Sequence, residues 1–277
     1  MIAARSTVVA AKSLVAVAAI AMIAAVSPVH AAQTSAQQKR VRVFASLPDW
    51  SGIWEPEAWS ERTLAGKPVG GIERVRAKSE LMGHPPYNAE WEARYQDGLK
   101  NLQAQRAASL KSKSCTLGFP MGMDSPAIFQ IALTPEEALF VFVTQEVRHV
   151  YTDGRPHAPD DERWLTRMGD SVGRWEGDTL VIETVARLPN DALAIASPLS
   201  KVSEQAKFTE RVRLVNPNVL EDEMTIEDPV TLARPWTVKI RYRRVTDLQR
   251  MSTYDCTEND RNPVVDGKLT VTPSANP

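Results

Sequence analysis

The residues with the clearest capacity for chemistry lie in one short polar segment, Tyr151–His157, which reads YTDGRPH. Histidine titrates near neutral pH, and a nearby carboxylate such as Asp153 would fix its tautomer and raise its pKa. Arg155 could hold a carboxylate or polarise a carbonyl. The same residues also suit a structural role, because Asp-Gly is a turn signal and Asp153 could brace the loop against Arg155. Both interpretations stay open.

Two carboxylates lie on strand faces that otherwise look apolar. Glu210 shares one face of a predicted strand with Phe208 and Val212, and Asp222 shares the face of Leu220 on another. A buried carboxylate is costly unless it is paired or protonated. These acids therefore pair with an interior arginine or histidine, point into a water-filled cavity, or are turned outward by a bulge.

Gly169–Gly173 reads GDSVG and matches the G-x-S-x-G pattern of a nucleophile elbow. That elbow follows a strand, opens a helix and needs a histidine later in the chain. Here a strand and a tight turn follow, and no histidine occurs after Ser171. The glycines therefore favour a bend or bulge at a barrel rim over a serine hydrolase.

Few side chains are available for a metal site, which needs three or four nitrogen, sulfur or oxygen ligands. His149 and His157 could form one with Asp153 or Glu210 only if the loop and the barrel converge, and no HExxH motif occurs. We therefore predict no metal and no cofactor.

The first residues have the pattern of an export signal. Arg5 and Lys12 give a positive start, Leu14–Val26 is apolar, and Val29–Ala31 fits a small-residue cleavage site. A membrane anchor is the alternative, but the apolar run is short for a spanning helix of about 20 residues. We expect cleavage and a periplasmic or secreted mature protein that is not inserted in a membrane.

The net charge and the cysteine content limit the expected partners and the expected cellular compartment. The net charge of −1 gives no reason to expect nucleic acid or an anionic membrane surface as a partner. The two cysteines are Cys115 and Cys256. In an oxidising compartment an even count favours a disulfide between them over a reactive thiol.

The chain has one convincing helix, expected over Asn88–Leu110, where Asn88 can act as the N-cap and apolar residues recur at helical spacing. Before it, residues 33–48 read as a loose leader, Asp49–Trp54 as a turn into a short strand, and residues 55–86 as irregular surface structure. Further along, the apolar period changes to two, which is typical of strands. The predicted strands are 128–133, 138–145, 147–152, 171–176, 179–186, 207–215, 219–227, 236–245 and 249–256.

Connections between these strands show no helical pattern long enough for the crossovers that parallel strands need. We therefore predict a mainly β fold, an antiparallel up-and-down barrel with one N-terminal outer helix. In the clearest hairpin, 219–227 pairs with 236–245, with acids beside bases outside and apolar groups inside. The predicted organisation is a signal peptide over 1–31, an irregular segment with the helix over 32–114, the barrel over 115–262 and a tail over 263–277.

Six motifs in fixed order carry a resemblance to a protein family. They are YTDGRPH, GDSVGRWEGDTLVIET, TERVR, DEMTIEDP, RPWTV and YDCTENDR. Together, within residues 45–262, they resemble a family of exported bacterial proteins that look lipocalin-like. The resemblance implies a lipocalin-like barrel but no particular reaction. Asp170 stands where the family's usual GHSIG motif has a histidine, so a family role for that histidine does not transfer to this chain.

A barrel of this class can hold one small ligand. We expect an exported protein that binds a small apolar or aromatic molecule inside its barrel, and we make no prediction of its oligomeric state. Aromatic residues on strands are more often core than ligand contacts, so a packed interior is the alternative. The predicted ligand-binding residues are Trp175, Trp236, Asp222 and Tyr242.

If the protein is an enzyme, we expect cofactor-independent acid–base chemistry of the lyase, isomerase or hydratase type. His157 or His149 would act as base or acid, Asp153 or Glu210 would orient it, and Tyr151 or Arg155 would steady oxyanion charge. The other two hypotheses are a non-catalytic binder or carrier and a structural envelope protein. A cavity with a histidine and a carboxylate favours the enzyme, an apolar cavity the binder, and a filled barrel the structural protein.

Overall fold

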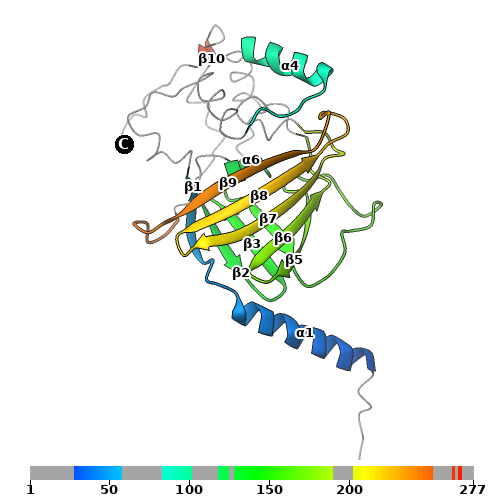
Figure 1. The fold of residues 1–277 in the computed structure, drawn as a ribbon, viewed down its shortest axis with the longest axis vertical. Helices are drawn as coiled ribbons and strands as arrows, with labels where there is room; N and C mark the ends of the chain where they lie inside the picture. Colours follow the sequence, from blue (N-terminus) through cyan, green and yellow to red (C-terminus); the bar gives the residue numbers. More distant parts are fainter. Residues whose placement is uncertain are drawn as a thin grey trace, which may run out of the picture. The chain divides into compact units, whose positions relative to one another are not determined.

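The computed structural model describes residues 28–57, 83–101, 118–124, 128–189, 202–251, 264–265 and 268–269 (Figure 1). The chain divides into two compact units, Met1–Ala36 and Gln37–Pro277. The apolar region of the export signal and both cysteines lie outside the described residues. Signal cleavage and the disulfide between Cys115 and Cys256 therefore stay predictions.

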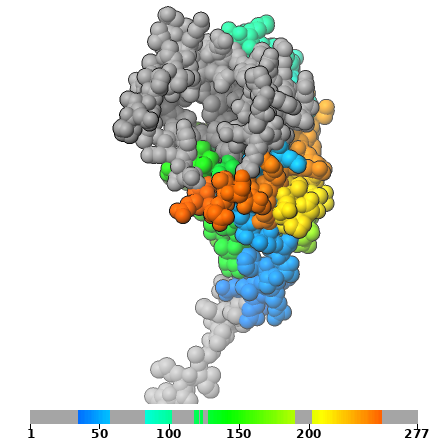
Figure 2. Space-filling model, turned by 90° about the vertical axis from the view of Figure 1, so that its left-hand side faces the viewer, coloured from blue at the N-terminus to red at the C-terminus, as the bar shows by residue number. Residues whose placement is uncertain are grey.

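The second unit contains a closed barrel of nine strands, which confirms a mainly β barrel. The strands are β1 Gly52–Pro56, β2 Phe129–Leu133, β3 Glu137–Phe142, β4 Val147–Tyr151, β5 Asp170–Glu176, β6 Thr179–Val185, β7 Lys207–Asn216, β8 Val219–Glu227 and β9 Trp236–Val245. They follow one another around the ring in chain order. The ring closes where β9 pairs with β1, and in Figure 2 the blue of β1 lies beside the orange of β9.

One neighbouring pair corrects the expectation of a fully antiparallel barrel. β4 and β5 run parallel, with Tyr151 opposite Val172, whereas the other pairs around the ring are antiparallel. The reason is geometric: a ring in which every strand reverses direction needs an even number of strands, and this ring has nine. The chain passes from the end of β4 to the start of the parallel strand β5 without a helix, through the connection over residues 152–169, which we call the crossover loop.

Two predictions outside the barrel differ from the structure. Helix α1, Pro28–Ser46, occupies most of the stretch that we expected to be a loose leader. Residues 249–251 belong to no strand, so the last predicted strand does not begin where we expected, and its remaining residues lie outside the described part of the chain. A further short pair, β10 Val264–Val265 and β11 Lys268–Leu269, forms its own two-stranded sheet.

Helix α4, Ala89–Lys100, confirms the start of the predicted helix. Asn88 caps it, because its side-chain oxygen accepts a hydrogen bond from Trp91 N at 3.1 Å. The predicted continuation to Leu110 lies outside the described residues beyond Asn101. A four-residue helix, α6 Met121–Asp124, precedes β2. None of the described helices is both long and apolar enough to span a membrane.

Aromatic and aliphatic side chains fill the inner face of the barrel. The rings of Phe129, Phe140, Phe142 and Tyr242 lie with centroids 5.1–6.1 Å apart, from Phe129 to each of the others. These four side chains are at most 1% exposed, which leaves no water-sized space beside them. The described interior is therefore packed rather than hollow.

The hairpin of β8 and β9 has the predicted register and faces. Ile226 lies opposite Trp236 and Met224 opposite Val238, and all four side chains are buried. On the outer face Glu223 lies opposite Lys239, with an ion pair of 3.0 Å between them. Alternation with a period of two thus sets which face of this hairpin enters the core.

Candidate functional site

The barrel interior contains a fully buried cluster centred on Arg148 of β4. Its guanidinium donates to Glu210 Oε1 at 2.9 Å and also to Oε2, a bidentate ion pair with both side chains 0% exposed. It donates further to Thr184 Oγ1 at 2.8 Å and to Ser171 Oγ at 3.4 Å. Phe119 covers it, with the guanidinium carbon 3.7 Å from the ring centroid. Arg148 is thus the interior arginine that the position of Glu210 called for.

Asp222 of β8 lies in the same interior without a comparable partner. It is 0% exposed, and neither of its carboxyl oxygens makes a hydrogen bond among the described residues. Burial raises the pKa of the Asp222 carboxyl well above its usual range. The negative charge of Glu210 raises this pKa further, while the nearby Arg148 lowers it.

His157 is held by Asp170 rather than by Asp153 or Glu210, which corrects the expected pairing. Asp170 Oδ2 lies 3.0 Å from His157 Nδ1 and accepts the backbone N–H of Ala158 at 3.0 Å. His157 Nε2 is buried and has no hydrogen-bond partner in the described part of the chain. Asp170, the second residue of the GDSVG segment, therefore fastens the crossover loop to the start of β5.

The other polar residues predicted to be catalytic lie on the outside of the barrel. Asp153 binds Arg155, with 2.7 Å between Oδ2 and Nη2, and the Arg155 guanidinium lies 4.2 Å from the Tyr151 ring centroid. His149, with a 51% exposed side chain, lies 3.0 Å from Glu137 through Nδ1. The structure thus brings Tyr151, Asp153 and Arg155 together and joins neither His157 nor Glu210 to them by a hydrogen bond.

The residues predicted to bind a ligand belong to the packed core or its edge. Trp236 is 6% exposed, and Tyr242 and Asp222 are 0% exposed. Trp175 is partly buried and packs edge-on against Trp50, with ring centroids 5.1 Å apart. A ligand could reach the three buried side chains only if the interior opened.

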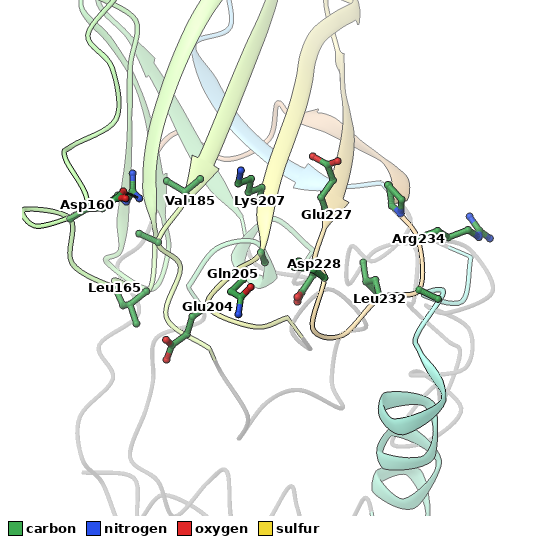
Figure 3. Close-up of a pocket in the computed structure, with 16 residues that line it drawn as sticks. Asp160, Leu165, Val185, Glu204, Gln205, Lys207, Glu227, Asp228, Leu232 and Arg234 are labelled. Carbon is green, nitrogen blue, oxygen red and sulfur yellow. Dashed lines mark hydrogen bonds and ion pairs between the residues drawn. The ribbon is translucent and has the colours of Figure 1, made fainter.

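A groove of about 780 Å³ lies instead at one end of the barrel. It is lined by the end of β6, the start of β7 and the segment before it, the end of β8, the turn between β8 and β9, and part of the crossover loop. Figure 3 shows Val185 of β6, Lys207 of β7 and Glu227 of β8 on adjacent strand ends above it, with Leu165 and Glu204 along its side. Sequence analysis did not identify this site, because its residues come from four separate segments of the chain.

Asp228 makes the central wall of the groove rigid. It is 3% exposed, and its Oδ2 accepts hydrogen bonds from Ser203 N at 2.6 Å and Thr231 Oγ1 at 2.8 Å. Its Oδ1 accepts from Ser203 Oγ at 2.8 Å and from Val230 N at 3.0 Å. One carboxylate thus joins the segment before β7 to the turn after β8.

A second contact fixes the turn between β8 and β9 from its other side. Tyr87 forms a β-bridge with Leu232, and Ala233 N donates to Pro86 O at 2.8 Å. Asn88, the cap of α4, donates through its backbone N–H to Thr231 O at 3.0 Å. The same residues that start α4 therefore hold one wall of the groove.

The third wall is the end of the crossover loop. Thr166 N donates to Ala186 O at 3.0 Å, and Leu188 N donates to Thr166 O at 2.7 Å, which locks the loop to the end of β6. Beside this clamp the side chain of Trp164 is 80% exposed and those of Leu165 and Leu188 are about 40% exposed. Leu165 lines the groove, so exposed apolar side chains lie at and beside its rim.

The groove differs from the interior in whether its charged side chains form ion pairs. Lys207, Glu227, Glu204 and Arg234 line it and make no ion pair within the described residues. Arg163 is already engaged by Asp160 and by the carbonyl oxygen of Ala158. Among the side chains that the structure describes, no group of three or more His, Cys, Asp or Glu could hold a metal ion.

Comparison of the sequence with protein-family models and with curated proteins finds no match.

Proposed function

We propose that this protein binds a small, largely apolar or aromatic molecule in the groove at the end of its barrel. The observation that carries the proposal is a preformed hollow of about 780 Å³ whose three walls are each fixed by hydrogen bonds. Ligand sites for small molecules commonly measure about 300–1,000 Å³ and are largely formed before the ligand arrives. A rigid wall also lowers the entropy lost on binding.

The location at the barrel end modifies the sequence-based expectation. An interior ligand would need space among side chains that leave none, since Phe129, Phe140 and Met224 are 0% exposed. The groove offers an apolar floor from Val185, Ala186 and Leu232. Charged groups of both signs stand around that floor, so a ligand with an apolar body and a polar end fits it best.

Native mass spectrometry of the chain purified from cells tests this proposal first. We expect a bound small molecule that is retained under gentle conditions and released on unfolding. A fluorescent aromatic anion, anilinonaphthalene sulfonate, then serves as a probe of the groove itself. Ala233→Trp, which places an indole in the groove, is expected to lower dye affinity at least tenfold.

The matched control is Val215→Trp. Val215 is 44% exposed near the end of β7, whereas the groove lies at the start of that strand. This variant adds the same side chain at the opposite end and should leave dye affinity unchanged. Equal dye binding by wild type and both variants would show that the groove is not the binding site.

Acid–base catalysis through His157 is a second candidate, which rests on one specific observation. Asp170 orients the ring through Nδ1, and Nε2 has no hydrogen-bond partner among the described residues, which is the arrangement that a general base requires. The test is to incubate the compound recovered from the protein with wild type and with His157→Ala. We expect product from wild type and at least a tenfold loss in the variant, about 1.4 kcal/mol, with the fold intact.

A different result would assign His157 a structural role. If His157→Ala and Asp170→Asn both lower the melting temperature and neither changes ligand binding or turnover, the pair only fastens the crossover loop.

The export of the mature protein and its membership of the lipocalin-like family belong to the same proposal. They rest on the charged and apolar start of the sequence and on the six motifs.

A further inference from the structure

We propose that the barrel folds around a neutral carboxylic acid at Asp222, so that the folded chain keeps a proton at pH values where an exposed aspartate has lost it, and is weakened as the pH rises further. The proposal stands on the placement of the side chain. Asp222 is 0% exposed, and both of its carboxyl oxygens are without a hydrogen-bond partner among the described residues. An ionised carboxylate in that position would lose its hydration and gain no donor in return.

The charges around Asp222 point to the same state. Arg148 from β4 already forms a bidentate ion pair with Glu210 from β7, so the pair is neutral as a unit. An ionised Asp222 would add a negative charge beside this neutral pair, with no hydrogen-bond donor of its own among the described residues. A neutral Asp222 adds no charge there, which is the less costly arrangement in a medium of low dielectric constant.

Among the described residues, the neighbouring strands place no further charged side chain on the inner face beside the carboxyl group of Asp222. Its register partners are Val212 on β7 and Ile240 on β9, both apolar. Ser171 of β5 and Thr184 of β6 present neutral hydroxyls, which are bound to Arg148. Glu223, the next residue on β8, lies on the outer face, where it binds Lys239. Its negative charge adds to the preference for a neutral Asp222.

The direction of the pH effect follows from proton counting. The pKa of Asp222 is raised in the folded state, mainly by burial and then by Glu210, relative to an exposed aspartate. Between the unfolded and the folded pKa values the folded state binds the extra proton. The contribution of this group to stability is therefore present at low pH and is lost as the pH rises through that window.

Asp222→Asn tests the proposal, because an amide has nearly the same shape and no charge. Urea unfolding of the full chain would be measured between about pH 5 and pH 7 for wild type and variant. We expect the ratio of their unfolding constants to change about tenfold per pH unit, in favour of the variant at higher pH. Glu223→Gln, on the same strand but the outer face, should show no such trend.

Two results would overturn the proposal. One is a ratio for Asp222→Asn that does not depend on pH, which would mean that Asp222 has the same charge in both states. The other comes from wild type alone and does not require the variant to fold. Carbon NMR of the folded chain should show one aspartate carboxyl that stays protonated at pH values where exposed aspartates are ionised, and its absence would also reject the inference.

Discussion

The barrel interior and the groove at its end handle polar groups in opposite ways. In the interior Arg148 and Glu210 are 0% exposed and satisfy one another, and Phe119 seals them from solvent. In the groove Lys207 and Glu227 lie on paired strand ends with no ion pair within the described residues, beside about 780 Å³ of open space. Charge is enclosed in one region and left accessible in the other.

This difference separates two roles that the sequence alone cannot separate. A buried ion pair with no space beside it cannot meet a substrate, but it restricts how the strands can pair, since each wrong register would bury an unpaired charge. Accessible charges on a rigid wall restrict the structure little and can select a ligand. We therefore propose that Arg148 and Glu210 serve the fold and that the strand ends serve binding.

Removing the interior arginine is expected to have the largest effect. Arg148→Ala leaves Glu210 buried without its cation, and such changes cost about 3–5 kcal/mol. Chemical denaturation would measure the loss. Arg174→Ala is the control, because its side chain is 58% exposed and pairs with Glu176 and Glu183 on the outer face. It should cost less than about 1 kcal/mol, and similar costs for both would contradict the contrast.

Trp236→Ala should cost about 3–5 kcal/mol as well, through packing rather than charge. The side chain is 6% exposed at the start of β9, where it meets Ile226 of β8. Lys239→Ala on the outer face of the same strand should cost under about 1 kcal/mol. Urea melts of the two variants check the assignment of faces, and equal midpoints would show that it is wrong.

Asp228→Asn should affect the groove more than the barrel. The amide cannot accept all the hydrogen bonds from Ser203, Val230 and Thr231, and an unsatisfied buried donor costs about 1–3 kcal/mol. We expect weaker binding of the aromatic dye together with faster hydrogen exchange of the turn after β8. If dye binding is unchanged while the whole barrel melts earlier, Asp228 supports the fold and not the site.

Glu221 and Asp222 are neighbours on β8 and should respond to pH in opposite directions. Partial burial raises the pKa of Glu221, but hydrogen bonds from Arg213 and Arg241 outweigh it and hold the pKa below its ordinary value. Its contribution is therefore present above the unfolded pKa and lost on acidification. Glu221→Gln should destabilise the chain at neutral pH but not in acid, as followed by denaturant titration at both pH values.

Trp164→Ala is expected to have the smallest effect on stability. The ring is 80% exposed, so its removal should change the free energy of unfolding by less than about 0.5 kcal/mol. Its position between two groove-lining residues, Arg163 and Leu165, suggests contact with a bound ring. Dye fluorescence titration would detect this contact as weaker binding by a fully stable variant, and unchanged affinity would limit the site to the groove floor.

The sequence was most informative where each strand has one apolar and one polar face. β8 and β9 begin and end at the predicted residues, because alternation assigns both faces without knowledge of any partner. It was least informative around β3, where Leu139, Phe140 and Val141 make both faces apolar. It was then ambiguous which face of the neighbouring strand β4 enters the core, and Arg148 was not singled out from the sequence.

The candidate site was harder to predict than the fold for a related reason. Arg148 and Glu210 are 62 residues apart, and the groove joins connections from even more distant parts of the chain. Local spacing, as in Tyr151–His157, correctly drew attention to a polar loop and to the Asp153–Arg155 pair. It could not show that the partner of His157 would be Asp170 at the start of the next strand.

The odd number of strands has a consequence for how this protein could change over time. β5 has seven residues, a span of about 23 Å, which an extended chain covers in about seven residues. The crossover loop over residues 152–169 is much longer than that minimum. It therefore holds surplus length, which among the described residues is paired with a neighbouring segment only at the β-bridge between Thr166 and Arg187. Insertions and substitutions there can reshape the rim around Trp164 and Leu165, and with it the proposed ligand site, while the ring of strands stays the same.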